Sequence, residues 1–195
     1  MKKTFGFSVH DIVEIAMLCS LSIILDQFLK IRIGATGGSI NLSMLPLLII
    51  SLRHGPFKGF IGGGIVFGFI TCLIDGYGLI TYPLEYFIAF GIVGILGFFS
   101  HFIHKSIEEN NKKNIILSYI VILVSMIIML VVRVLCGTID TLIIFSEYGY
   151  TFWGAVLYHL SYAGPSSGVV FIVLSLLLPV IVKINRLIKS PYLKD

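Results

Sequence analysis

The stretch "YPLEYFIAFGIVG", Tyr82 to Gly94, opens a long apolar run and carries the carboxylate Glu85 near its start. A membrane-spanning helix needs roughly 17–25 mostly apolar residues, and the run over residues 80–103 satisfies that length. An ionisable side chain at this depth costs on the order of 2.5–3.5 kcal/mol, so it usually faces a cavity or the interior of a bundle. Glu85 is therefore either an interfacial anchor or a carboxylate that lines an outward-facing pocket.

The whole chain has the composition of a membrane protein. Of its 195 residues, 57% are hydrophobic and 12% are charged, and the mean hydropathy is +1.01. A water-soluble domain of this size needs more polar surface. We predict an all-α membrane protein, one integral membrane domain over residues 1–195, with six transmembrane helices near 9–30, 39–53, 56–75, 80–103, 114–145 and 151–188.

The basic residues predict the orientation of these helices. Acidic residues at Asp11 and Glu14 interrupt the first apolar run and no small-residue cleavage site follows, so the first helix is expected to be retained. In a six-span protein most basic residues then fall on one side, which should be the cytoplasm. Both termini and the 104–113 loop are predicted to be cytoplasmic. This distribution explains the net charge of +4 without any nucleic-acid partner.

Motifs for catalysis, metals or nucleotides are missing from the sequence. The three cysteines stand singly in apolar runs, as buried small hydrophobic residues do. His101 and His104 form an HxxH pair with no nearby third ligand, which favours a pair at the cytoplasmic interface over a metal site. No phosphate-binding glycine loop is present. We therefore expect no enzyme, no metal and no cofactor, and a transporter would need energy from an ion or from another protein.

Small residues follow helical spacing in two places. Gly55, Gly59 and Gly63 recur every fourth residue, as do Gly64 and Gly68, which predicts close packing of the third helix on a neighbour. Ala16 and Ser20 have the same spacing in the first helix, where they form either an internal packing face or a docking face for a membrane partner. The polar stretch "IGATGGSINLS" between the first two helices suits a mobile cover over a cavity or a plain connector.

Five ionisable side chains lie at span depth and are candidates for function. Glu14 and Asp26 stand near opposite ends of the first helix, where interfacial water is within reach. Arg133 and Asp140 are seven residues apart on one helix face and suit a structural pair with other helices. Glu85 is the fifth.

Three stretches carry a resemblance to a known family: "DIVEIAMLCSLS", "TGGSINLSMLPLLIISLRHGPFKGFIGGG" and "EYFIAFGIVGILGFF". They resemble the thiamine-specific S component of energy-coupling factor (ECF) transporters, the ThiT (YuaJ) family, from about residue 8 to 103 and more weakly over 130–180. The resemblance implies a six-helix membrane protein that binds a vitamin near the outer face. It also implies delivery through a membrane T component driven by two cytoplasmic ATPases, which accounts for the missing nucleotide motif.

The resemblance assigns roles to particular residues. The substrate acid of the family falls on Glu85 and its neighbouring aromatic residue on Tyr86. A stacking aromatic falls on Phe145 and a tyrosine on Tyr158. A carboxylate can accept hydrogen bonds from an aminopyrimidine, and aromatic faces attract a thiazolium cation. Ala16 and Ser20 match the small-residue face through which S components contact the T component.

Two positions depart from the family pattern. Gly137 stands where the family has histidine, and Ala163 stands where it has asparagine. Asp140 or His159 would then have to substitute, or the ligand is a related pyrimidine or another small vitamin. A stand-alone transporter of a small cationic or vitamin-like solute, coupled to an ion gradient through Asp26 or Asp140, is the alternative, although no inverted internal repeat supports it.

The predicted orientation can be tested by cysteine labelling. A Lys194→Cys variant should be protected from a membrane-impermeant thiol reagent in intact cells and should react after permeabilisation, because the excess of basic residues holds this end in the cytoplasm. Labelling from outside the intact cell would contradict the orientation.

Overall fold

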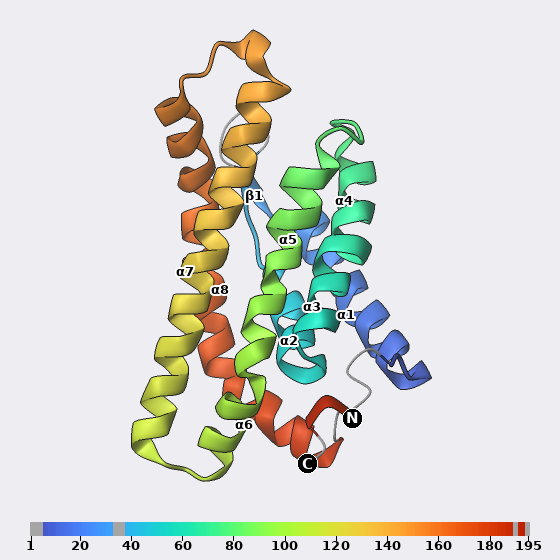
Figure 1. Cartoon of the computed structure of the whole chain (residues 1–195), viewed down its shortest axis with the longest axis vertical. Helices are drawn as coiled ribbons and strands as arrows, with labels where there is room; N and C mark the ends of the chain where they lie inside the picture. The colour runs from blue at the N-terminus through green and yellow to red at the C-terminus, as the bar shows by residue number, and fades with distance from the viewer. Residues whose placement is uncertain (1–5, 33–37, 189–190, 194–195) are drawn as a thin grey trace.

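The chain folds into one elongated helical bundle (Figure 1). The computed structural model describes residues 6–32, 38–188 and 191–193. Two short 3₁₀ turns, η4 (Ser146–Tyr148) and η5 (Pro191–Leu193), lie outside the main helices. The six helical segments are α1 (Val9–Phe28); α2 (Met44–His54); the continuous run α3 (Pro56–Phe60), η1 (Ile61–Phe67) and α4 (Gly68–Asp75); the run η2 (Tyr82–Ile88), α5 (Ala89–Gly91), η3 (Ile92–Phe99) and α6 (Ser100–Glu108); α7 (Lys112–Ile143); and α8 (Phe152–Leu187).

These segments confirm the predicted all-α membrane protein with six helices. Four are long and apolar enough to cross a membrane: Pro56–Asp75, Tyr82–Glu108, Lys112–Ile143 and Phe152–Leu187. The first segment, α1, has 20 residues, and α2 is a shorter apolar helix of 11 residues. Their shared core contains fully buried Leu47, Leu48, Phe67, Leu96, Ile122 and Leu174.

The predicted start of the second helix, at residue 39, was wrong. Residues Ser39–Ile40 form strand β2, which pairs antiparallel with β1 (Ile31–Arg32). Asn41 then makes a turn: its Oδ1 accepts hydrogen bonds from Ser43 N at 3.1 Å and from Ser43 Oγ at 2.8 Å. An asparagine that bonds the backbone two residues ahead competes with helix formation, so the helix begins only at Met44.

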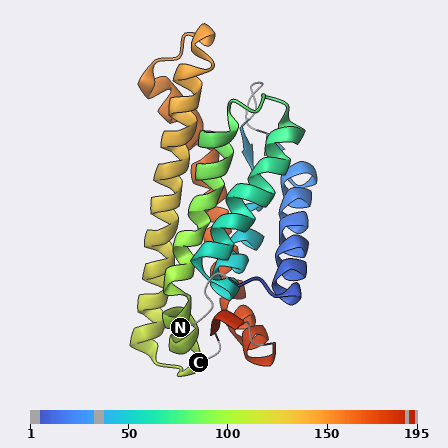
Figure 2. The ribbon, with the colours of Figure 1, turned by 45° about the vertical axis from the view of Figure 1, so that its right-hand side comes forward.

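Different connections between helices lie at the two ends of the bundle. The start of α1, the turn between α6 and α7, and η5 lie at one end, as an even number of crossings requires (Figure 1). The connection between α7 and α8 lies at the other end and extends beyond the neighbouring helices. Figure 2 shows α1 at the edge of the bundle, where it packs on α2 and η1. Among the described residues, one face of α1 is thus left without a protein neighbour.

The glycines of the third helical segment bring two backbones into direct contact, as their spacing predicted. A Cβ atom placed on Gly63 would lie 2.3 Å from the Phe90 carbonyl oxygen, and one on Gly64 would lie 2.6 Å from that of Phe87. A Cβ on Gly68 would lie 2.9 Å from the Tyr86 carbonyl oxygen. Any side chain at these positions would separate the helices. The contact therefore fixes η2, the element that carries Glu85.

A buried ion cluster holds α1 to α2 and α3 at the end opposite the α7–α8 connection. Lys58 Nζ lies 2.8 Å from Asp11 Oδ2, and His54 bridges two carboxylates, with Nδ1 3.1 Å from Asp11 Oδ1 and Nε2 3.1 Å from Glu14 Oε2. Arg53 also pairs with Glu14. Arg53 and Lys58 belong to the basic residues that fall on the predicted cytoplasmic side, and both are buried.

The same cluster reaches α8 and α6 through neutral groups. Arg53 donates to Asn185 Oδ1, and the Asn185 amide contacts His104. His104 Nδ1 in turn lies 2.8 Å from the Ser100 carbonyl oxygen. Because a buried charge needs partners that lipid cannot supply, this network of contacts joins five of the six helical segments at one end of the bundle.

Replacing one packing glycine tests the contact between the third and fourth segments. Gly63→Ala should lower the Tm in detergent, since the new methyl group would force the two backbones apart; overpacking of this kind costs about 1–3 kcal/mol. Gly168→Ala is the matched control, because no atom of the described residues lies within 4 Å of its added Cβ. Equal Tm values for the two variants would show that the close contact does not contribute to stability.

Candidate functional site

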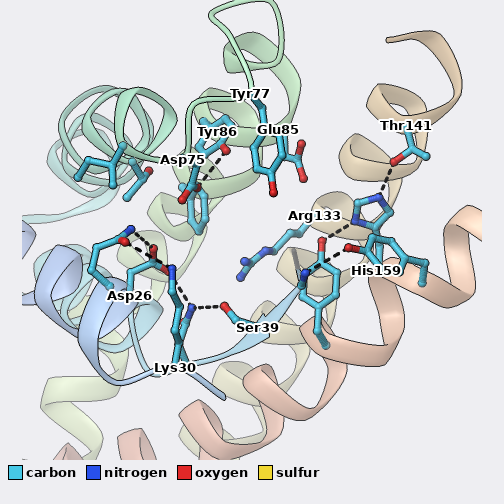
Figure 3. A pocket seen from close by; sticks show the side chains of 18 of the residues that line it. Asp26, Lys30, Ser39, Asp75, Tyr77, Glu85, Tyr86, Arg133, Thr141 and His159 are labelled. Atoms are coloured by element: carbon cyan, nitrogen blue, oxygen red, sulfur yellow. Dashed lines mark hydrogen bonds between the residues drawn. The ribbon is translucent and has the colours of Figure 1, made fainter. Parts of the chain in front are cut away.

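A polar cavity of about 750 Å³ opens near the end of the bundle that carries the α7–α8 connection. Its walls come from the C-terminal part of α1, residues 38–41, the end of α4, η2, α7 and the start of α8. Figure 3 shows side chains from these elements surrounding a common space. It is the natural candidate for a binding site, because ligand sites are concave and combine apolar walls with a few placed polar groups.

The predicted substrate-binding residues meet in this cavity. Glu85, Tyr86, Phe145 and Tyr158 all line it: the first two come from η2, Phe145 from the connection between α7 and α8, and Tyr158 from α8. Tyr86 Oη donates to Asp75 Oδ2 at 3.1 Å. Phe145 stacks edge-on against Tyr77 with ring centroids 6.2 Å apart, and Tyr158 packs against Tyr150 at 6.1 Å. The structure thus brings together one carboxylate and several aromatic faces.

The predicted docking residues lie elsewhere. Ala16 and Ser20 are on the exposed face of α1, away from the cavity-lining residues. Ser20 Oγ donates to the Ala16 carbonyl oxygen at 2.8 Å, within the helix. The internal packing alternative therefore does not hold for these two side chains, which face outward from the bundle.

Arg133 extends from α7 into the centre of the cavity (Figure 3). Its guanidinium lies 4.8 Å from the centroid of the Phe90 ring, and Nη1 lies 3.3 Å from Met44 Sδ. Within the described part of the chain it makes no ion pair of 4 Å or less. Asp140, on the same helix, is buried beside the Glu85 carboxyl, and neither of its oxygens has a hydrogen-bond partner among the described residues.

Two further carboxylates line the opposite wall. Asp26 Oδ1 accepts a hydrogen bond from Asn41 Nδ2 at 2.7 Å, and Asp26 Oδ2 accepts one from Gln27 at 3.0 Å. Asp75 is held by Tyr86. Asp26 was predicted either to reach interfacial water or, in the alternative stand-alone transporter, to couple transport to an ion gradient, whereas Asp75 was not among the candidates. Asp75 stands just before Gly76, which ends α4 with a φ of 75°. A carboxylate directly before a helix-ending glycine was the sequence feature that could have marked Asp75 as a residue at the end of the bundle.

The charges of the lining residues do not cancel. Three carboxylates, on Asp26, Asp75 and Glu85, face two cations, on Lys30 and Arg133, which gives a formal charge of minus one. His159 is the lining histidine. A site with one excess negative charge and aromatic walls favours a ligand with a single positive charge, through both ion pairing and cation–π attraction.

A family model described as thiamine transporter protein (YuaJ) matches residues 12–189. The chain belongs to this family. Its membership identifies a membrane transporter rather than an enzyme, as predicted.

Similar proteins cover nearly the whole chain. The thiamine transporter ThiT of Bacillus subtilis (strain 168) is 28% identical over 192 residues, which span 92% of this chain and 94% of that protein. A solved structure of ThiT from Listeria monocytogenes superposes with a TM-score of 0.69 at 22% identity and covers 91% of this chain and 96% of that one. That likeness confirms the ThiT-like bundle.

The two departures from the YuaJ family pattern have different surroundings. Ala163 is buried and does not line the cavity. Gly137 lies under the His159 ring, which takes up the space that a side chain at 137 would need. Of the two residues considered as substitutes, His159 lines the cavity, whereas Asp140 is not among its lining residues.

The glycine-rich connector contributes directly to the cavity. Residues 33–37 lie outside the described residues, but Gly38, Ser39 and Asn41 line the space. Gly38 N donates to Tyr158 Oη at 3.1 Å, and Asn41 N donates to Ser166 Oγ at 3.0 Å. The described part of the connector is therefore bonded to α8 on the cavity wall.

Proposed function

We propose that this protein is the substrate-binding S component of an ECF-type transporter. It captures thiamine in the cavity at the outer face of the membrane and passes it to a membrane T component energised by two ATPases. The observation that carries the proposal is the cavity with one excess negative charge and aromatic walls, found in a member of a thiamine transporter family. The Bacillus subtilis relative, named a thiamine transporter, supports the choice of ligand.

Thiamine suits the lining residues in its charge and in its two aromatic rings. It is a monocation with two planar rings, and a monocation neutralises the formal charge of the lining residues. The Glu85 carboxylate is suited to accept hydrogen bonds from the aminopyrimidine, and such charge-assisted bonds are stronger than neutral ones. The faces of Tyr86, Phe145 and Tyr158 each offer the thiazolium an attraction of roughly 0.5–2 kcal/mol.

The energising partner is proposed to dock on α1. Ala16 and Ser20 give this exposed face a small-residue surface on which another membrane helix can pack closely. The buried ion cluster of Asp11, Glu14, Arg53, His54 and Lys58 attaches the same helix to the rest of the bundle. Force applied to α1 by a partner is therefore transmitted to α2 and α3.

The first test concerns the cavity. Glu85→Gln keeps the shape of the side chain but removes its charge, so the Kd for thiamine should rise about ten- to a hundredfold, since a hydrogen bond to a charged group is worth roughly 1.5–3 kcal/mol. The Tm should not fall, because a neutral group at this depth is easier to bury. Calorimetric titration of wild type and variant in the same detergent measures the Kd, and thermal unfolding of both proteins without ligand measures the Tm.

The control for that test is an acid outside the cavity. Glu147→Gln removes an exposed carboxylate near the same end of the bundle, and it should leave the Kd unchanged. Unchanged thiamine affinity in Glu85→Gln as well would make Glu85 a structural anchor and would argue against the proposed site.

The second test concerns docking. Ala16→Trp should abolish thiamine uptake and co-purification of the T component and ATPases, while the Kd of the isolated protein stays nearly the same, because the cavity lies elsewhere in the bundle. Ile172→Trp, an exposed site on α8, is the bulky control and should retain uptake. Uptake by wild type without any co-purifying partner would instead support a stand-alone ion-coupled transporter.

A further inference from the structure

The wall of the cavity formed by α7 and α8 depends on one very short approach between the two helices. A Cβ atom on Gly137 would lie 2.5 Å from both Nδ1 and Cε1 of the His159 ring. Side-chain carbon atoms essentially never come within 3.0 Å of a neighbour in this way. The present position of the His159 ring is therefore available only while residue 137 is glycine.

The His159 ring is also fixed by hydrogen bonds at both nitrogens. Nε2 lies 2.9 Å from Thr141 Oγ1, one turn along α7 from Gly137. Nδ1 lies 2.5 Å from the Tyr162 hydroxyl on α8. The side chain is 4% exposed. The ring is therefore held in a single orientation by its contact with the Gly137 backbone and by these two hydrogen bonds. In this orientation it connects α7 to Tyr162 of α8.

The effect of this link extends across the aromatic wall. The Tyr162 ring lies against Gly38, where a Cβ atom would be 2.2 Å from Cδ1 of the tyrosine. The neighbouring Tyr158 ring is 5.2 Å from His159 and 5.6 Å from Tyr162, between ring centroids, and its hydroxyl accepts the bond from Gly38 N. Both tyrosines line the cavity.

We propose that Gly137 and His159 form one positioning unit of the substrate site. Gly137 leaves the space into which His159 reaches from α8, and the imidazole then holds Tyr162, and through it Tyr158, in the orientation that a planar cationic ligand requires. The unit thus determines affinity for thiamine-like ligands through the shape of the tyrosine wall. This inference rests on the proposed binding of thiamine in the cavity.

A double-mutant cycle tests whether the two residues act together. Gly137→Ala alone should raise the Kd for thiamine about tenfold or more, because the added methyl group displaces the His159 ring. His159→Ala alone should raise it by a similar factor. In the double variant the methyl group at 137 faces the space left by the ring, so its Kd should match that of His159→Ala within about twofold. If the increase in Kd of the double variant instead equals the product of the increases of the two single variants, the proposal is overturned.

Control variants separate positioning from general damage. Gly168→Ala introduces the same change on α8 into open space and should leave the Kd unchanged. His159→Asn keeps a polar atom close to the position of Nδ1, and should recover part of the affinity lost in His159→Ala by retaining the bond to Tyr162. In calorimetry the number of binding sites per folded protein should stay constant while the Kd changes. A lower number of sites at constant Kd, or no recovery by asparagine, would assign His159 a purely structural role and overturn the proposal.

Thermal unfolding of the same variants without ligand distinguishes failure of this inference from failure of the proposed function. Gly137→Ala should lower the Tm in the wild-type background and leave it unchanged in the His159→Ala background. If wild type does not bind thiamine, the proposed function is wrong, and the unfolding data alone decide whether the two residues form a unit. Additive changes in Tm would show that they do not.

Discussion

Charges inside an apolar bundle must be matched by other groups of the protein, since lipid offers no solvation. This constraint is met differently at the two ends of the molecule. At the end with the α6–α7 turn, Asp11 and Glu14 lie in direct ion pairs with Arg53, His54 and Lys58, so α1 is held without any ligand. In the cavity at the other end, Arg133 has no ion pair among the described residues and the carboxylates outnumber the cations by one. The first arrangement is suited to hold helices together, and the second is suited to receive a cation.

Close contacts at glycines determine where the charged and aromatic groups of the cavity lie. Gly63, Gly64 and Gly68 allow the third segment to touch the backbone of the fourth, and this contact sets where Glu85 and Tyr86 enter the cavity. Gly137 allows the His159 ring of α8 to lie against α7, and Gly38 allows the Tyr162 ring to lie against the connector before α2. The site therefore depends on backbone positions as much as on the polar side chains that line it, and of these glycines Gly38 alone lines the cavity itself.

Hydropathy predicted the six helical segments well because long apolar runs have few alternatives in a membrane, and the misplaced start of the second helix arose from the local turn at Asn41. The resemblance to the YuaJ family led to Glu85, Tyr86, Phe145 and Tyr158, which share one cavity. Sequence alone did not reveal the ion cluster, because Asp11 and Lys58 are 47 residues apart and basic residues near span ends also occur as markers of orientation. The sequence also showed Gly137 only as a position where the histidine of the family is absent. It could not show that the His159 ring fills this space, because His159 belongs to another helix.

The contact between Gly137 and His159 limits the order in which such a site can arise during evolution. A histidine at 159 cannot adopt its present orientation while residue 137 carries any side chain, because both would occupy the same volume. An ancestor would first have to acquire the glycine, and only then would the histidine be favourable. Once both are present, reversal at 137 alone is blocked by the ring. The two positions are thus epistatic, and descendants of this protein are expected to change them as a pair or to retain both.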